Sequence, residues 1–195
     1  MIGRLVATSA VVVVLSTLAF GVGYPLLVTG IGQTAFASQA NGSLITKDGK
    51  VVGSKLVAQE FTGNQWFHER PSGVAYNAAA TSFANLGPTS ADLATAVHKQ
   101  LVAVIALEGP YNPGLAAAGV PVDAVTTSGS GIDPDISPAY AALQSHRIAA
   151  VSGLPLATVA QLIKKNTDGR SLGFFGEPGV NVLKLNLALA KAEGH

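Results

Sequence analysis

The sequence has no cysteine among its 195 residues, and only 12% of its residues are charged. The missing cysteine excludes a lipoprotein anchor attached to an N-terminal thiol, but it says little about compartment, because reducing and oxidising environments both hold cysteine-free proteins. Removing Arg4 from the 12 Lys and Arg leaves 11, which equal the 11 Asp and Glu of residues 32–195. This balanced part of the chain has no basic excess, so nucleic acid is not an expected partner. A domain so sparse in charge favours contact with a partner subunit.

Charge is absent above all from the N-terminus, where Arg4 is the only charged side chain before Lys47. Residues 5–28 read LVATSAVVVVLSTLAFGVGYPLLV, and as a helix this run of about 24 residues is roughly 36 Å long, against a hydrocarbon core of roughly 30 Å. The alternative is a cleaved secretory signal ending at Ala35-Phe36-Ala37, but a signal has a shorter apolar run of about 7–15 residues. The sequence therefore predicts a transmembrane anchor over residues 1–31 and a single α+β domain over residues 32–195.

The span carries an orientation signal and internal punctuation. Arg4 and the N-terminal amine favour a cytoplasmic N-terminus and an extracytoplasmic domain, although Lys47 is just within range on the other side. Two small-xxx-small pairs, one ending at Gly21 and one at Gly23, would let a second helix approach closely, unless glycine and alanine are simply common in spans. Pro25 is expected to end or kink the helix, and Tyr24 suits the headgroup interface. The candidate helix-packing residues are Gly21, Gly23, Tyr24 and Pro25.

The remaining chain alternates between short patterns and irregular segments. Residues 42–61 predict a β-hairpin, because two apolar runs flank Asp48-Gly49, a strong type I′ turn signal. Residues 61–88 are rich in Gly, Asn, Ser and Pro and predict a long loop, of a kind usually functional or packed on a partner. Helices are expected from a Thr89 or Ser90 cap to Gly109-Pro110, over 137–152, and over 155–165 with Leu156, Val159, Leu162 and Ile163 inward. A linker should cover 111–121, and the alternation of residues 180–189 favours a strand over a helix.

The densest polar cluster lies at residues 125–138, and its candidate residues are Ser128, Gly129, Ser130, Gly131 and Asp133. Such hydroxyls and glycines could present backbone N–H groups to an anion in front of a helix. The favoured alternative is a structural loop in which Asp133 and Ser137 cap turns and the helix start.

Templates for catalysis are not matched by this chain. It has no Ser-x-x-Lys, Gly-x-Ser-x-Gly or Walker pattern, and the histidines do not have the spacing of metal ligands. The segment Trp66-Phe67-His68-Glu69-Arg70 is interpreted as a packed loop with a solvated Glu69 and Arg70. The sequence predicts no catalytic residue and no metal site.

Taken in order, many short motifs along the chain resemble one family, the C subunit of the bacterial Kdp potassium-transporting ATPase (KdpC). They are Gly23-Tyr24-Pro25, Thr29-Gly30, Gln33, Gly42-Ser43-Leu44-Ile45, Gly53-Ser54, Gln59, Phe61, Trp66-Phe67-His68, Arg70-Pro71-Ser72, Tyr76-Asn77, Asn85-Leu86-Gly87-Pro88, Val125-Thr126, Ser128-Gly129-Ser130-Gly131-Ile132-Asp133-Pro134, Ile136-Ser137-Pro138, Gln144, Arg147, Gly176-Glu177-Pro178, Val180-Asn181-Val182-Leu183 and Leu185-Asn186-Leu187-Ala188-Leu189. The chain departs from the family at Thr81-Ser82-Phe83-Ala84, where a glycine-containing run is usual, and at Thr127 and Ile132.

The resemblance implies an accessory, non-catalytic subunit of an ATP-driven potassium uptake complex in the bacterial inner membrane. Its partners would be an ATP-hydrolysing subunit, a potassium-channel-like subunit and the lipid bilayer. The subunit would stabilise the assembly and raise the apparent ATP affinity of the ATPase subunit. ATP enters by family association only, and no cofactor is expected in the chain itself. Two alternatives stay open: a membrane-anchored hydrolase or ligand-binding domain that uses residues 125–138, and direct ATP binding by the same cluster.

Overall fold

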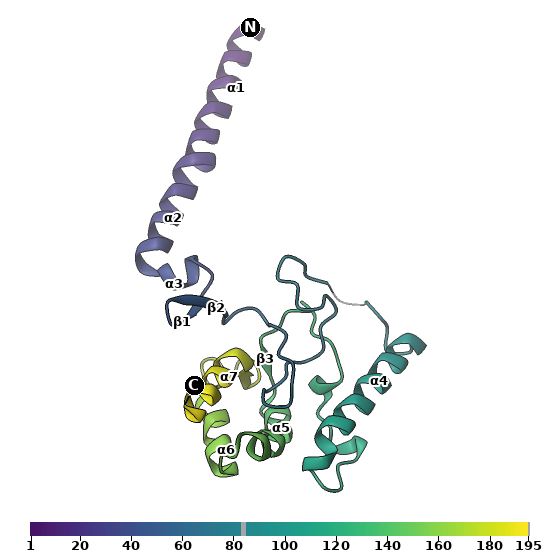
Figure 1. Cartoon of the computed structure of the whole chain (residues 1–195). Coiled ribbons are helices and arrows are strands. Elements are labelled where there is room, and N and C mark those ends of the chain that lie inside the picture. Colours follow the sequence, from purple (N-terminus) through teal and green to yellow (C-terminus); the bar gives the residue numbers. More distant parts are fainter. Residues whose placement is uncertain (83–84, 195) are drawn as a thin grey trace. The chain divides into compact units, whose positions relative to one another are not determined.

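The structure, a computed structural model, describes residues 1–82 and 85–194 (Figure 1). The chain forms two compact units, Met1–Leu44 and Ile45–His195. The predicted division between residues 31 and 32 stays a prediction. Phe83 and Ala84, which belong to the departure from the family pattern, and the terminal His195 lie outside the described residues.

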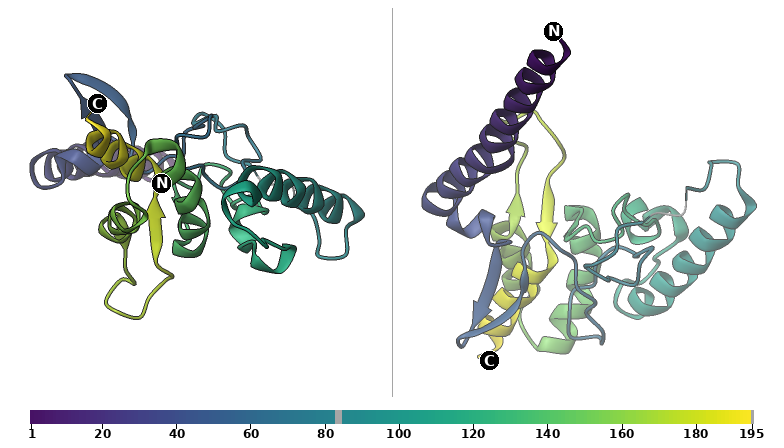
Figure 2. Two further views of the ribbon diagram at one scale, coloured as in Figure 1. Left: turned by 60° about the horizontal axis from the view of Figure 1, so that its bottom comes forward. Right: turned by 90° about the horizontal axis from the view of Figure 1, so that it is seen from above.

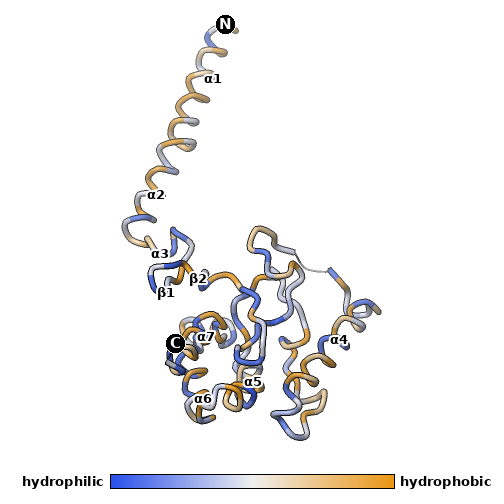
Figure 3. Tube along the Cα trace, viewed as in Figure 1, coloured by the Kyte–Doolittle hydropathy of each residue, from blue (hydrophilic) through white to orange (hydrophobic). Residues whose placement is uncertain are grey.

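The first unit is an apolar helix that runs without interruption from Ile2 to Ala35 and has a mean hydropathy of 2.3. It consists of α1 (Ile2–Ser16), the π-helical segment η1 (Thr17–Gly23) and α2 (Tyr24–Ala35), followed by the short α3 (Ala37–Ala40). Figure 3 shows its apolar character along almost its whole length. By length and composition, this helix could cross a membrane once.

The sequence predicts that Pro25 ends or kinks the helix. It does not end it, because α2 continues for another ten residues. The turn before the proline is instead π-helical, and the Tyr24 N–H donates to the Ala19 carbonyl, five residues back. A proline ring clashes with the carbonyl of the residue four positions earlier and supplies no N–H of its own. Widening the preceding turn by one residue accommodates both effects.

The second unit begins with the predicted hairpin, formed by β1 (Leu44–Lys47) and β2 (Lys50–Ser54). Asp48 has φ 52° and Gly49 has φ 75°, the pair of positive angles that a type I′ turn requires. The long loop predicted for residues 61–88 is also present, because the described residues between β2 and α4 (Ala91–Glu108) form neither helix nor strand. Ser90 caps α4 by accepting a hydrogen bond from the Leu93 N–H at 3.4 Å.

Between α4 and the C-terminal part lie three short 3₁₀ turns within and beyond the predicted linker: η2 (Gly109–Tyr111), η3 (Ala117–Gly119) and η4 (Val122–Ala124). The C-terminal part then contains β3 (Asp135–Ile136), α5 (Pro138–Ser152), α6 (Leu156–Lys165), β4 (Thr167–Asp168), β5 (Gly179–Asn181) and α7 (Val182–Glu193). The three strands form an antiparallel sheet in the order β3-β5-β4, with Ile136 and Thr167 both opposite Val180. Ser137 caps α5 as the sequence predicts, and Gly153 ends the helix in the left-handed conformation.

The strand predicted for residues 180–189 is wrong beyond Asn181, since residues 182–193 form α7. Asn181 caps this helix, because its Oδ1 accepts a hydrogen bond from the Lys184 N–H at 3.2 Å. The buried residues of α7 are Val182, Leu183, Leu185, Asn186, Leu189 and Ala190, which follow a helical period of three and four. The apparent alternation arose because a polar residue, Asn186, occupies a core position of the helix.

The core lies among α4, α5, α6, α7 and β5, and Phe67 from the long loop belongs to it. Figure 2 shows two further views of the ribbon. Along α6, Val159 and Ile163 are buried and Leu162 is half-buried, as expected, whereas Leu156 is exposed. Leu156 is the first residue of α6, directly after Pro155, and the packed face of this helix begins one turn later at Val159.

Candidate functional site

The long loop is attached to the core through side-chain amides that act on its backbone. Asn186 of α7 bonds both polar groups of Phe67: its Oδ1 accepts from the Phe67 N–H at 2.9 Å, and its Nδ2 donates to the Phe67 carbonyl at 2.9 Å. Gln144 of α5 binds the backbone of His68 in the same way: its Oε1 accepts from the His68 N–H at 2.7 Å, and its Nε2 donates to the His68 carbonyl at 3.0 Å. Each amide therefore replaces the neighbouring strand that an extended segment would otherwise need.

Arg147 completes this attachment from the next turn of α5 and is fully buried. Its guanidinium donates to the carbonyls of Asn64 and Trp66 and to Gln144 Oε1, and its Nε donates to Glu108 Oε1 at 2.9 Å. Burial raises the pKa of the Glu108 carboxyl, and the Arg147 charge opposes this rise. We call Glu108, Gln144, Arg147 and Asn186 the polar clamp, because these four residues connect α4, α5 and α7 to one loop.

A cavity of about 390 Å³ lies between this loop and α4, and its walls include Glu60, Phe61, Glu69, Tyr76, Leu107 and Tyr140. Glu69 is only 6% exposed, which contradicts the expectation that it is solvated. Its carboxylate accepts a long hydrogen bond from the Phe61 N–H at 3.4 Å. Burial, with a smaller contribution from Glu60, raises the pKa of Glu69 to about 8.

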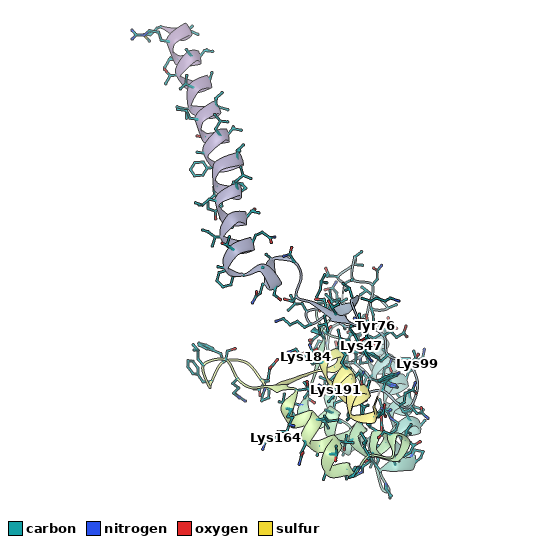
Figure 4. The ribbon with its side chains drawn as sticks, turned by 60° about the vertical axis from the view of Figure 1, so that its left-hand side comes forward. Lys47, Tyr76, Lys99, Lys164, Lys184 and Lys191 are labelled. Atoms are coloured by element: carbon teal, nitrogen blue, oxygen red, sulfur yellow. The ribbon has the colours of Figure 1, made fainter. Side chains whose placement is uncertain are left out.

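Other titratable groups beside this cavity respond to the same burial. The pKa of Tyr76, labelled in Figure 4, is raised to about 12, while its hydroxyl donates to the Arg70 carbonyl at 3.1 Å. Burial lowers the pKa of His68, whose Nε2 is 2.8 Å from the Gly63 carbonyl. At neutral pH burial therefore favours the neutral forms of Glu69, Tyr76 and His68.

The sequence interpretation placed Arg70 in solvent, and the structure contradicts this as well. It pairs with Asp133 at 3.3 Å and donates to the Thr127 carbonyl at 3.2 Å, and its side chain is about a quarter exposed. Arg70 thus connects the long loop to the polar cluster of residues 125–138.

Within that cluster, the candidate side chains accept hydrogen bonds from backbone N–H groups two or three residues further along the chain. Ser128 Oγ accepts from the Gly131 N–H at 2.9 Å, Ser130 Oγ accepts from the Ile132 N–H at 3.2 Å, and Asp133 Oδ1 accepts from the Asp135 N–H at 3.1 Å. Gly131 is buried and has φ 75°, and a Cβ there would lie 2.8 Å from a backbone oxygen of the long loop. These bonds are the turn-capping contacts of a structural loop, and Gly129 alone of the five candidates is open to solvent with no such contact among the described residues.

The helix-packing candidates lie on the other unit, where Gly21 and Gly23 belong to η1, and Tyr24 and Pro25 begin α2. All of them are exposed in the single chain, as are the other residues of the long helix except the half-buried Gly32. Their role in packing stays a prediction.

Sequence reasoning missed the polar clamp as a unit, although its signals are present in the chain. Gln144 and Arg147 are three residues apart on α5, and therefore on one face, and Asn186 interrupts a run of leucines. A charged residue on the buried face of a helix requires a partner, and here the partner lies 39 positions earlier in the sequence. No group of three or more potential metal-ligating side chains is found among the described residues.

The structure thus combines a helix suited to anchoring in a membrane with a small α+β domain organised around one long loop. The family described as K⁺-transporting ATPase, c chain, matches residues 6–191, and the chain belongs to this family, KdpC. A potassium-transporting ATPase KdpC subunit of Methylococcus capsulatus is 53% identical over 176 residues, covering 89% of this chain and 90% of the relative. Proteins of the same name from Mycobacterium tuberculosis and Beijerinckia indica are 49% and 47% identical, covering 89% and 90% of this chain and 90% and 88% of those relatives. The chain is accordingly a component of a potassium transport complex.

Proposed function

We propose that this chain is an accessory, non-catalytic subunit that stabilises the potassium-transporting complex and raises the apparent ATP affinity of its ATPase subunit. Membership of the family is the observation that carries the proposal. The anchor helix supports it, because 34 residues without a buried side chain provide a surface for lipid or for neighbouring helices. The internally bonded polar cluster supports it as well, since its hydroxyls already accept backbone hydrogen bonds.

The proposed topology has a cytoplasmic N-terminus and an extracytoplasmic domain in the bacterial inner membrane. In that arrangement the domain cannot touch cytoplasmic ATP, so its influence on ATP affinity must be allosteric. Such an influence requires that the subunit bind two states of the ATPase with different affinities. Direct ATP contact through Ser128 to Asp133 would require the opposite topology.

The proposed contacts of the anchor involve two sides of the helix. Gly21 and Gly23 are two positions apart, so their side-chain positions point in roughly opposite directions around a helix. Each ends a small-xxx-small pair, which suits one close approach of a neighbouring backbone. The anchor could then pack between two helices, which we assign to the ATP-hydrolysing and the potassium-channel-like subunits.

Labelling in intact cells tests the topology, because the chain has no cysteine of its own. A single Val122→Cys substitution places a thiol on η4, where the native side chain is 72% exposed. Labelling by a membrane-impermeant maleimide is expected without permeabilisation. If labelling occurs only after permeabilisation, the domain is cytoplasmic and direct ATP contact becomes the better explanation.

Purification of the complex tests the helix contacts. Gly21→Leu with Gly23→Leu should reduce recovery of the partner subunits, whereas Ala10→Leu, a small-to-large change on the same helix away from the paired glycines, should not. Equal recovery from all variants would remove the packing argument.

A kinetic assay tests the affinity role independently. Adding the full-length chain to a complex purified without it should lower the KM for ATP, and an unchanged KM would exclude the affinity role.

A further inference from the structure

The segment between β4 and β5 forms a hairpin whose tip is apolar. Beyond the paired strands, Ser171 and Phe175 face each other and exchange backbone hydrogen bonds of 2.8 and 2.9 Å. The three residues between them close the turn, with Leu172 at φ 53° and Gly173 at φ 83°. Figures 2 and 4 show this hairpin projecting from the helices of its own unit. We call Leu172, Gly173, Phe174 and Phe175 the apolar tip.

The apolar tip is exposed to an extent that is unusual for such residues. Leu172 is 82% exposed, Phe174 65% and Phe175 57%, and the two rings contact each other with centroids 4.1 Å apart. Leu172 also holds a left-handed backbone conformation, which a bulky side chain rarely adopts. Within the described part of the chain, the tip residues are not in the core cluster or among the side chains packed against it. A tip that serves only to connect two strands would carry polar turn residues.

Polar pairs occupy the base of the same hairpin. Arg170 pairs with Glu177 at 2.6 Å, and Lys184, labelled in Figure 4, pairs with Asp168 at 3.5 Å. The hairpin therefore changes from neutralised charge at its base to aromatic and aliphatic side chains at its end. This order suits a lipid interface, where aromatic rings lie at the acyl boundary and charged groups lie among the headgroups.

The anchor helix keeps a bilayer close to the domain whatever the domain's orientation. The helix ends at Ala35 and the second unit begins at Ile45, so residues 36–44 can reach at most about 32 Å when fully extended. A domain of about 150 residues has a radius of gyration of only about 15 Å. A protein partner is less well matched, because a stable protein interface buries about 800 Å² on each side and involves some 20–30 residues.

We propose that the apolar tip inserts into the interface of the lipid bilayer that the chain's own helix crosses, and so forms a second membrane contact of the domain. The inference requires the helix to lie in the bilayer, but it holds for either side of the membrane and for the chain without its partner subunits.

Fluorescence quenching of the full-length chain in phosphatidylcholine vesicles tests the proposal. Three single-cysteine variants, Phe174→Cys, Val122→Cys and Val14→Cys, are labelled with an environment-sensitive fluorophore. The emission of Trp66 confirms that each variant keeps the native fold. The label at position 174 should be quenched by spin-labelled acyl chains and protected from aqueous iodide, whereas the label at position 122 should show the reverse.

The three positions separate the ways in which the proposal fails. If position 14 is quenched by acyl chains but position 174 is as accessible to iodide as position 122, the lipid contact is refuted and the anchor stands. If position 14 is not quenched either, the anchor and the lipid contact both fail. If position 174 becomes protected only when the other subunits are added, the tip docks on protein, and the lipid proposal is also refuted.

Discussion

Replacing Glu69 by glutamine should change how the stability of the domain depends on pH. Glu69 is buried beside the cavity, with a long hydrogen bond and no cation in contact with its carboxyl group in the described part of the chain. Its pKa is raised from 4.5 to about 8 by burial, so the folded chain holds a proton that the unfolded chain releases. The difference corresponds to at most about 5 kcal/mol in the free energy of unfolding.

The sign follows from proton binding in the two states. Below about pH 4.5, Glu69 is protonated whether the chain is folded or unfolded, and its protonation adds no pH dependence. Between about pH 4.5 and about 8 the unfolded chain binds fewer protons, so the free energy of unfolding falls as pH rises, by about 1.4 kcal/mol per pH unit from this group. Above about pH 8 both states are ionised and the contribution becomes constant. Glu69→Gln removes this slope, because a glutamine amide does not titrate.

Urea unfolding of the full-length chain in detergent, followed by the emission of Trp66, measures the effect. Trp66 is the only tryptophan of the chain and belongs to the same loop as Glu69. The free energy of unfolding of the variant, relative to that of the native chain, should rise between pH 5 and pH 8 by up to about 4 kcal/mol. Glu177→Gln is the matched control, since its side chain is 79% exposed and should leave the pH profile unchanged. Parallel profiles for Glu69→Gln and the native chain would refute the reasoning.

Three further substitutions test the contacts that hold the loops. Arg147→Met should reduce the free energy of unfolding by about 3–5 kcal/mol, because the Glu108 carboxylate is left buried without its cation, and a second change, Glu108→Leu, should restore part of the loss in the same urea assay. Asn186→Leu should cost about 1–3 kcal/mol by leaving a buried N–H and a buried carbonyl of the long loop without partners, with faster amide hydrogen exchange in that loop as the independent measurement. Gly131→Ala should lower the thermal midpoint by an amount equivalent to about 1–3 kcal/mol, because the new Cβ meets a backbone oxygen at 2.8 Å, whereas Gly129→Ala, with nothing within 4 Å, should leave the midpoint nearly unchanged.

Local signals in the sequence were reliable where one short-range interaction decides the conformation. The Asp48-Gly49 turn and the Ser90 and Ser137 caps were all predictable, because each depends on residues within a few positions of one another. The strand expected at residues 182–189 is wrong because the alternation of apolar and polar residues suggested that the polar ones face solvent. Asn186 is instead a core residue of a helix. Leucine and alanine favour the helix, and the Asn181 cap starts it.

The polar clamp and Glu69 could not have been placed from the sequence in the same way. Phe67 and Asn186 are 119 positions apart, and Glu108 and Arg147 are 39 apart, so no spacing rule brings them together. Glu69 and Arg70 were expected in solvent because charged residues in loops usually are. Packing of the loop against α4 and α5 removed Glu69 from water, and that depends on the whole fold.

The sequence by itself determined that the chain has an apolar helix long enough to span a membrane and that it resembles the potassium ATPase subunit family. Both properties are local or additive: hydropathy sums along a segment, and motifs keep their order along a chain. Only the tertiary structure decided that a polar side chain from α7 and two from α5 hold the long loop, and that Leu172, Phe174 and Phe175 lie exposed outside the core cluster. Burial is a property of what surrounds a side chain, and residues far away in the sequence supply those surroundings.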